Sequence, residues 1–180
     1  MRKLVVRALV VAATAATALL VTTAAAQASA SPKEHDPVFD NGTGSVGVLV
    51  TKLSHADATS RLRSSGITWS SSGNCSDRYN STCTSFEQVN LSTIQGIQTL
   101  KSASGCGINV TGGTETGHAS GTYSHWNGYK LDISLNSCVS GYIQGTFTSI
   151  GGSKWQSGSG NIYYLEGNHW DITYYNCGGC

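Results

Sequence analysis

The sequence predicts an α+β fold in which N-terminal helices pack on a mainly antiparallel sheet that disulfides hold together. Three observations support this fold class. Apolar residues recur at helical spacing up to about residue 105, they alternate with polar residues afterwards, and the chain contains six cysteines. Helices that come first and strands that come later indicate α+β with an antiparallel sheet.

Residues 1–30 are predicted to be a secretory signal peptide. The chain starts with basic residues, residues 8–26 are almost wholly Ala, Val, Leu and Thr, and Ala-x-Ala cleavage sites follow. A membrane anchor is the alternative, because the apolar run is nearly long enough to span a bilayer. Residues 31–45 are expected to form a flexible tether, and residues 46–180 to form a single domain.

Composition narrows the class of partner. The net charge is +1 and the basic residues are scattered along the chain, so no basic patch of the kind that binds nucleic acid is expected. No second hydrophobic segment follows the signal, so no membrane contact is expected after its cleavage. The mature chain is therefore expected to be a secreted monomer, extracellular or associated with the cell wall.

All six cysteines follow the predicted signal peptide, and an even number in an exported chain indicates disulfides. Six cysteines allow fifteen pairings, of which the nearest-neighbour scheme is expected: Cys75–Cys83, Cys106–Cys138 and Cys177–Cys180. The last pair could instead be a redox or metal pair. A redox pair would require a helix N-terminus to lower one thiol pKa, so the disulfide is favoured.

The first predicted elements are a strand over 46–52 and a helix over 54–64. Ser54 and Asp57 form a capping pattern at the start of this helix, and Gly66 ends it.

A loop over 70–83, closed by a disulfide, leads into a second helical region. Both Thr84 and Ser92 begin N-terminal signatures there, and Gly105 ends the region. The period of two then predicts strands around Ile108 and Val110, over 131–135, over 142–150, and one or two more within 162–175.

One candidate metal motif surrounds Asn127-Gly128, a strong two-residue turn signal. If these residues form a hairpin turn, His125 lies opposite Lys130 and diagonal to Asp132. Residues 130 and 132 share one face of their strand. His125 and Asp132 would then reach the same ion, and imidazole and carboxylate are ordinary zinc ligands.

A second candidate motif lies between Glu166 and His169. In a straight strand these residues would face opposite sides, so they converge only if the chain turns at Gly167-Asn168. With that turn, His169 supplies a third ligand and Glu166 can act as a base. Three protein ligands with an open fourth position are the pattern of catalytic zinc.

The two motifs, His-x-x-Gly-x-x-x-Asp and Glu-x-x-His-Trp, resemble those of the zinc D-Ala-D-Ala carboxypeptidases and dipeptidases. Their relatives include the L-alanyl-D-glutamate endopeptidases and hedgehog signalling domains. The resemblance covers residues 54–175 in element order, including a strand that runs into Gly112-Gly113. It implies a hedgehog/DD-peptidase-like fold, zinc held by His125, Asp132 and His169, and Glu166 as general base.

The sequence departs from the family pattern in two places. Thr114-Glu115 stands where the family has an arginine that binds substrate, and Lys130 replaces a small residue. We hypothesise that Lys130 supplies the missing cation. His118 is the alternative, because a histidine can donate to a developing oxyanion.

Two further residues have alternative interpretations. Trp126 is expected to line the substrate cleft, although such aromatic residues more often pack in the core. Asp171 either orients His169 from outside the ligand set or lies on the surface.

The resemblance implies zinc-dependent hydrolysis of peptidoglycan stem peptides at a bond next to a D-amino acid. Two other classes stay open. One is a non-catalytic, zinc-containing cell-wall binding module of the same fold. The other is a disulfide-stapled inhibitor or adhesion protein without metal.

Overall fold

The structure is a computed structural model that describes residues 50–175, all of which belong to the second of two units, Asp36–Cys180. The predicted signal peptide, the tether and the Cys177–Cys180 pair therefore lie outside the described residues, as does most of the strand expected over 46–52.

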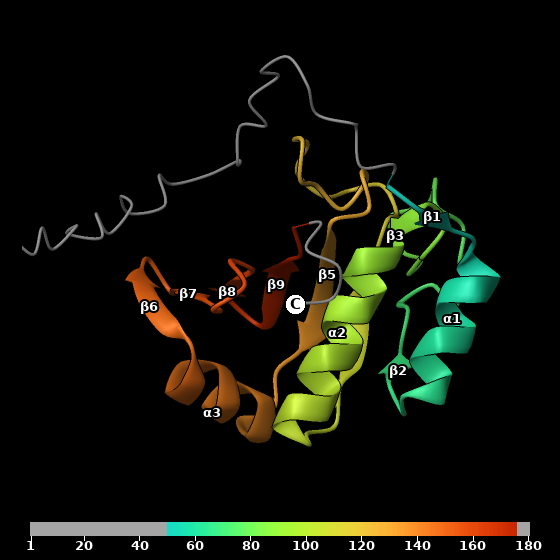
Figure 1. Ribbon diagram of the computed structural model, residues 1–180. Helices are drawn as coiled ribbons and strands as arrows, with labels where there is room; N and C mark the ends of the chain where they lie inside the picture. Colours follow the sequence, from blue (N-terminus) through green and yellow to red (C-terminus); the bar gives the residue numbers. More distant parts are fainter. Residues whose placement is uncertain (1–49, 176–180) are drawn as a thin grey trace, which may run out of the picture. The chain divides into compact units, whose positions relative to one another are not determined.

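The described chain is α+β, as predicted (Figure 1). The helices are α1 (His55–Ser64), α2 (Leu91–Ser104) and α3 (Ser137–Thr146). Two short strands, β1 (Lys52–Leu53) and β3 (Val89–Asn90), pair with each other. The remaining strands form one sheet in the order β2-β4-β5-β9-β8-β7-β6. They are β2 (Thr68–Trp69), β4 (Asn109–Gly112), β5 (Lys130–Ser134), β6 (Thr148–Gly151), β7 (Lys154–Gln156), β8 (Ile162–Glu166) and β9 (His169–Thr173). All neighbours in this sheet are antiparallel except β2 and β4.

The two faces of the large sheet have opposite character because side chains alternate along each strand. One face carries buried apolar residues of β5, β8 and β9: Leu131, Ile133, Tyr163, Trp170 and Ile172. They belong to one hydrophobic core with the inward side chains of α2, Ile94, Ile97 and Leu100. The other face carries polar residues, among them Asp132, Asp171, His169 and Glu166.

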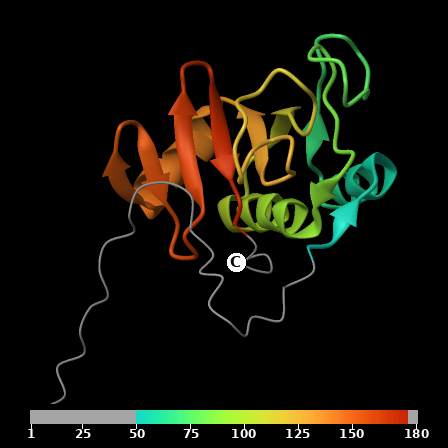
Figure 2. The ribbon, with the colours of Figure 1, turned by 90° about the horizontal axis from the view of Figure 1, so that it is seen from above.

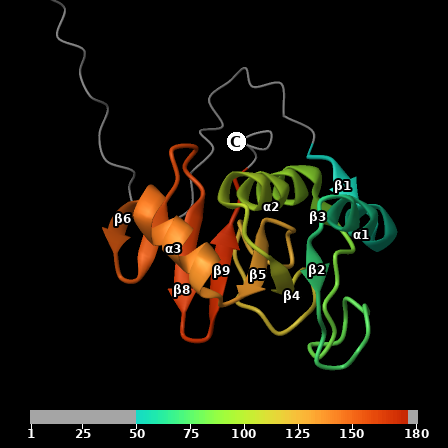
Figure 3. The ribbon, with the colours of Figure 1, turned by 90° about the horizontal axis from the view of Figure 1, so that it is seen from below.

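Helix α1 begins and ends as its sequence predicts. The Ser54 hydroxyl accepts a hydrogen bond from the Asp57 backbone N–H, and Gly66 follows the helix at φ 67°. Buried Ala58 and Leu62 lie one turn apart on its inner face. Helix α1 packs beside α2, as Figure 3 shows from below.

Helix α2 begins near the second of its two predicted N-terminal signatures, at Ser92, and not at the first, at Thr84. Thr84 is not a helix N-cap, because its hydroxyl donates to the carbonyls of Ser70 and Thr111 and so joins separate loops. The helix begins at Leu91, close to the second signature, and ends at Gly105 in the left-handed conformation. Tertiary contacts therefore decided between two local signals of similar strength.

The strand predicted over 142–150 is wrong for most of its length. Asn136 caps α3 by accepting a hydrogen bond from the Val139 N–H, and buried Val139 and Ile143 lie four residues apart. That spacing is helical, and only the end of the segment pairs as β6. Three short strands, β2, β6 and β7, form outer parts of the sheet, and β2 and β7 were not predicted.

Both predicted disulfides within the described residues are present. Cys75–Cys83 closes the loop after β2, and Cys106–Cys138 joins the chain after α2 to the first turn of α3. Disulfides are typical of proteins that reach an oxidising compartment. Within residues 50–175, no helix combines the length and apolar character needed to cross a bilayer.

The two disulfides should differ in their effect on stability. Because the unfolded chain gains more freedom when a longer loop is opened, Cys106→Ser/Cys138→Ser, with a sequence separation of 32, should cost about 4 kcal/mol. Cys75→Ser/Cys83→Ser, with a separation of 8, should cost about 2–3 kcal/mol. Urea unfolding of the two double variants measures the difference. A larger loss from the short loop would contradict the entropic account.

Candidate metal centre

The candidate centre lies on the polar face of the sheet, where β5 and β9 meet the long loop between β4 and β5. Figure 2, seen from above, shows this loop in yellow beside the strands. Asp132 projects from the middle of β5 and pairs in register with Gly112 on one side and Asp171 on the other. A Cβ added to Gly112 would stand 2.5 Å from Asp132 Oδ2, so only glycine leaves room for this carboxylate.

His125 reaches Asp132, but not by the predicted hairpin. The residues before Asn127-Gly128 form no strand; instead the Gly128 N–H donates to the His125 carbonyl across a tight turn, at 2.8 Å. Gly128 also accepts hydrogen bonds at its carbonyl from Asn90 and Thr93 at the start of α2. The loop is thereby fixed, and His125 Nε2 lies 3.2 Å from Asp132 Oδ1.

Glu166 and His169 converge through the turn that their spacing requires. They form the closing pair of the β8–β9 hairpin, and Gly167 between them has φ 62°. His169 Nε2 lies 3.7 Å from Asp132 Oδ1 and 3.8 Å from Glu166 Oε2. The Glu166 side chain is half exposed, so its carboxylate remains open to solvent.

His118, which the sequence offered only as an oxyanion donor, lies inside the same cluster. Its Nδ1 is 3.7 Å from Asp132 Oδ2, and its ring stacks on that of His125 with centroids 3.8 Å apart. His118, His125 and Asp132 each offer one donor atom within 4.8 Å of the others, so this group could hold a metal ion.

The three histidines are each held by an acceptor outside the cluster. His125 Nδ1 donates to the Gly113 carbonyl, and His169 Nδ1 donates to Asn168 Oδ1. His118 Nε2 donates to the Glu115 carboxylate at 3.1 Å. The second nitrogen of each ring is therefore the one that faces Asp132. Outer partners of this kind orient histidine ligands in metal sites.

The residues present fit a metal ion because one buried oxygen has no other partner. Within residues 50–175, Asp132 Oδ1 is buried and accepts no hydrogen bond, although two histidine nitrogens approach it. A buried carboxylate oxygen in this position is costly unless a cation compensates it. Imidazole nitrogen and carboxylate oxygen are the donors that zinc takes.

The charges and hydrogen bonds of the cluster shift the pKa values of Asp132, His118 and Glu115. Burial alone would raise the pKa of Asp132, but contact with His125 and the charges of His169 and His118 lower it below the usual value. The hydrogen bond to Glu115 raises the pKa of His118 despite partial burial. Burial opposes the ionisation of Glu115, but hydrogen bonds from His118, Ser85 and Gly113 lower its pKa.

Lys130 and Asp171 form an ion pair with each other on the polar face of the sheet. Lys130 Nζ donates to Asp171 Oδ2 at 2.8 Å, so the ammonium is already paired. Asp171 consequently contacts Lys130, whereas the outer partner of His169 is Asn168. The sequence did not identify Glu115 as a functional residue; a carboxylate three residues before His118 was the only local signal.

A cleft of about 270 Å³ opens beside the cluster. His118 and Glu115 lie at one side of it, and Trp126, 37% exposed, lies at another. The rest of the lining is small and uncharged: Thr116, Gly117, Ala119, Ser120, Gly121, Ser124 and Asn127. Trp126 thus lines a cleft beside the cluster.

Comparison with known proteins gives no match among protein-family models, curated proteins or solved structures.

Glu115 should stabilise the fold in a pH-dependent way. Its pKa is lowered on folding, so its contribution is complete above the pKa of an unfolded glutamate, about 4.3, and is lost as the pH falls through the lower folded value. Glu115→Gln should therefore cost about 1–3 kcal/mol at pH 7 and progressively less towards pH 3. Urea unfolding with chelator present measures both proteins. A cost that does not change with pH would show that the charge has no role.

Proposed function

We propose that this protein is a secreted zinc peptidase that cleaves peptidoglycan stem peptides next to a D-amino acid. In this proposal, His125, Asp132 and His169 hold the zinc and Glu166 is the general base. One observation carries it: the unpartnered Asp132 Oδ1 lies 3.2 Å from His125 Nε2 and 3.7 Å from His169 Nε2.

The orientation of the rings favours His169 over His118 as the third ligand. An imidazole binds a metal through a lone pair that lies in the ring plane. The His118 and His125 rings are stacked with an interplanar angle of 15°. An ion in the plane of one ring therefore lies outside the plane of the other, whereas His169 approaches Asp132 from a different strand.

The other residues then take separate roles. When bound, zinc supplies Lewis acidity, which polarises the scissile carbonyl and lowers the pKa of a water. Glu166, open to solvent and 3.8 Å from His169, takes a proton from the attacking water and passes it to the leaving amine. His118, which Glu115 holds with its Nδ1 facing Asp132, lines the cleft and helps to position the substrate there. The Lys130 hypothesis loses support because its ammonium is paired with Asp171.

The substrate class and the hedgehog/DD-peptidase-like fold rest on the two motifs and on the order of elements. Helices precede the sheet, β4 runs into Gly112-Gly113, and the second motif closes a hairpin. Secretion rests on the predicted signal peptide, and the two disulfides agree with it.

A zinc-containing binding module without catalysis is the second candidate, and the position of His118 favours it. If the His118 ring turned by rotation about its side-chain bonds, it would join His125, Asp132 and His169 as a fourth protein ligand. A zinc ion with four protein ligands is typical of structural sites.

The first test is zinc content followed by release of amino groups from purified peptidoglycan stem peptides. Wild type should bind one zinc and hydrolyse the peptide. Glu166→Gln should keep the zinc and lose about 10²–10⁴-fold in kcat, because only the base is removed. Asp132→Asn should lose both. Zinc without hydrolysis in wild type would favour the binding module, and absence of zinc would exclude both metal functions.

His118→Ala separates the two metal candidates. As a residue that positions the substrate from the cleft lining, His118 can be removed with zinc affinity nearly unchanged while kcat falls on the order of 100-fold. As a fourth ligand, its removal should instead weaken zinc binding. Competition with a chromogenic chelator measures the affinity, and a fall in zinc affinity as large as that of His125→Ala would refute the three-ligand centre.

A further inference from the structure

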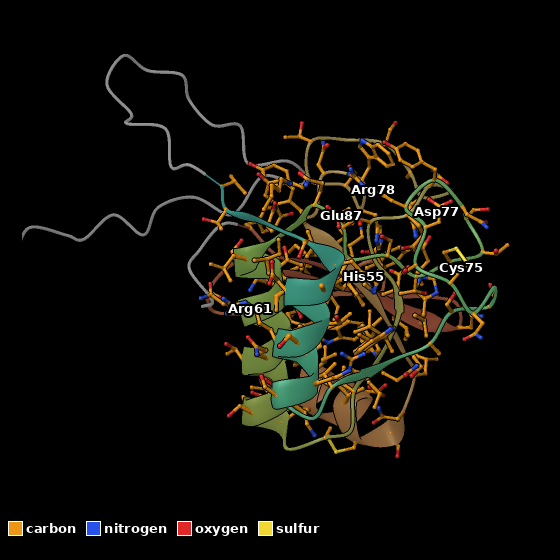
Figure 4. All side chains as sticks on the ribbon, turned by 90° about the vertical axis from the view of Figure 1, so that its right-hand side faces the viewer. His55, Arg61, Cys75, Asp77, Arg78 and Glu87 are labelled. Carbon is orange, nitrogen blue, oxygen red and sulfur yellow. A yellow bond between two sulfur atoms is a disulfide. The ribbon has the colours of Figure 1, made fainter. Side chains whose placement is uncertain are left out.

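The loop closed by Cys75–Cys83 places one arginine against the candidate centre. The loop leaves the sheet after β2 and carries Asp77 and Arg78, which Figure 4 shows beyond the N-terminal end of α1. Its own hydrogen bonds shape it: the Thr84 N–H donates to the Cys75 carbonyl, and the Tyr79 N–H donates to Asp77 Oδ1. Arg78 is therefore presented from a loop with a fixed conformation.

Arg78 contacts both of the segments that contribute lining residues to the cleft, 113–118 and 123–128, here called its two walls. Its Nε donates to the Thr114 carbonyl at 3.2 Å, on the wall that continues to Glu115 and His118. Its Nη2 donates to the Trp126 carbonyl, on the wall that follows His125. In addition, the Thr116 N–H donates to the Arg78 carbonyl at 2.9 Å. One residue thus joins two segments that are separate in sequence.

The guanidinium also holds the Trp126 ring. Its central carbon lies 3.7 Å from the ring centroid, and Tyr79 meets the same indole edge-on at 5.7 Å. Within the described chain, no carboxylate forms an ion pair with Arg78. Its side chain contacts two backbone carbonyls and one aromatic face. The planar guanidinium, with several N–H donors, can make all three contacts at once, whereas a lysine ammonium cannot.

The two walls are the segments that position the histidines. The Gly113 carbonyl on one wall accepts a hydrogen bond from His125 Nδ1 on the other. Within the first wall, Glu115 accepts a hydrogen bond from His118. The separation of the walls therefore sets how His125 faces Asp132 and how its ring stacks on His118. It also sets the place of Trp126 in the cleft lining.

We propose that Arg78 is a positioning residue that ties the two walls of the cleft together and thereby orients His125, His118 and Trp126. The tie itself follows from contacts within the fold; its effect on zinc rests on the proposed function. Arg78 acts through the planar geometry of its guanidinium, so a lysine with the same positive charge does not replace it.

Amide hydrogen exchange of Arg78→Met and Arg78→Lys tests the tie without any metal. In both variants, segments 113–118 and 123–128 should exchange on the order of tenfold faster, because each loses the hydrogen bond that Arg78 gave it. Arg63→Met is the matched control, since Arg63 stacks on Trp69 with its central carbon 4.8 Å from the ring. It removes an arginine–tryptophan contact elsewhere and should leave both segments unchanged.

Zinc affinity of the same variants, measured by chelator competition, supplies the second result. Loss of an outer support typically weakens metal binding 10–100-fold, so Arg78→Met and Arg78→Lys should both lose at least about tenfold. Unchanged exchange in both segments, full rescue by Arg78→Lys, or faster exchange across the whole chain would overturn the proposal. If wild type binds no zinc, the proposed function fails, while the exchange result still decides whether Arg78 ties the walls.

Discussion

The Asp132 carboxylate is the group around which the polar face of this protein is arranged. It stands on β5, an inner strand of the large sheet, between Gly112 and Asp171, and its Oδ1 is buried without a hydrogen-bond donor among residues 50–175. A charge in such a place must be compensated, because desolvation disfavours it strongly. The surrounding histidines provide that compensation in part, and they lower the pKa of Asp132 by doing so. A bound cation would complete it.

The fold surrounds this carboxylate with side chains from two kinds of segment, strands and a loop. Asp132 and His169 lie on neighbouring strands whose register is fixed by the core on the opposite face, where Ile133 pairs with Trp170. His125 and His118 come from a loop, and loops hold a geometry only through specific contacts. Those contacts are hydrogen bonds to backbone carbonyls and to Glu115, together with the contacts that Arg78 makes with both cleft walls.

The position of the His118 ring distinguishes the two proposed functions of the centre. The ring is stacked on that of His125, so an ion in the plane of one ring lies outside the plane of the other. In the proposed function, this leaves one coordination position for the substrate. In the second proposed function, rotation of the His118 side chain would instead add a fourth protein donor. The two proposed functions, hydrolysis and structural zinc binding, therefore differ in the angle of this side chain, which Glu115 holds through a 3.1 Å hydrogen bond. The proposed catalysis requires that this hydrogen bond keep the ring away from the zinc.

The sequence by itself determined the features that depend on near neighbours. It predicted the fold class, the caps of α1, the end of α2, the turn at Gly167 and both described disulfides, because caps, turns and short loops are set by local chemistry. The helix over 137–146 also has local signals, the Asn136 cap and the spacing of Val139 and Ile143, although a strand was predicted over its second half. Only the tertiary structure decided that Lys130 pairs with Asp171 and that Arg78 meets Trp126. These depend on strand register and on loops that meet across the sheet. Contacts between residues far apart in the chain leave no spacing in the sequence from which they could be predicted.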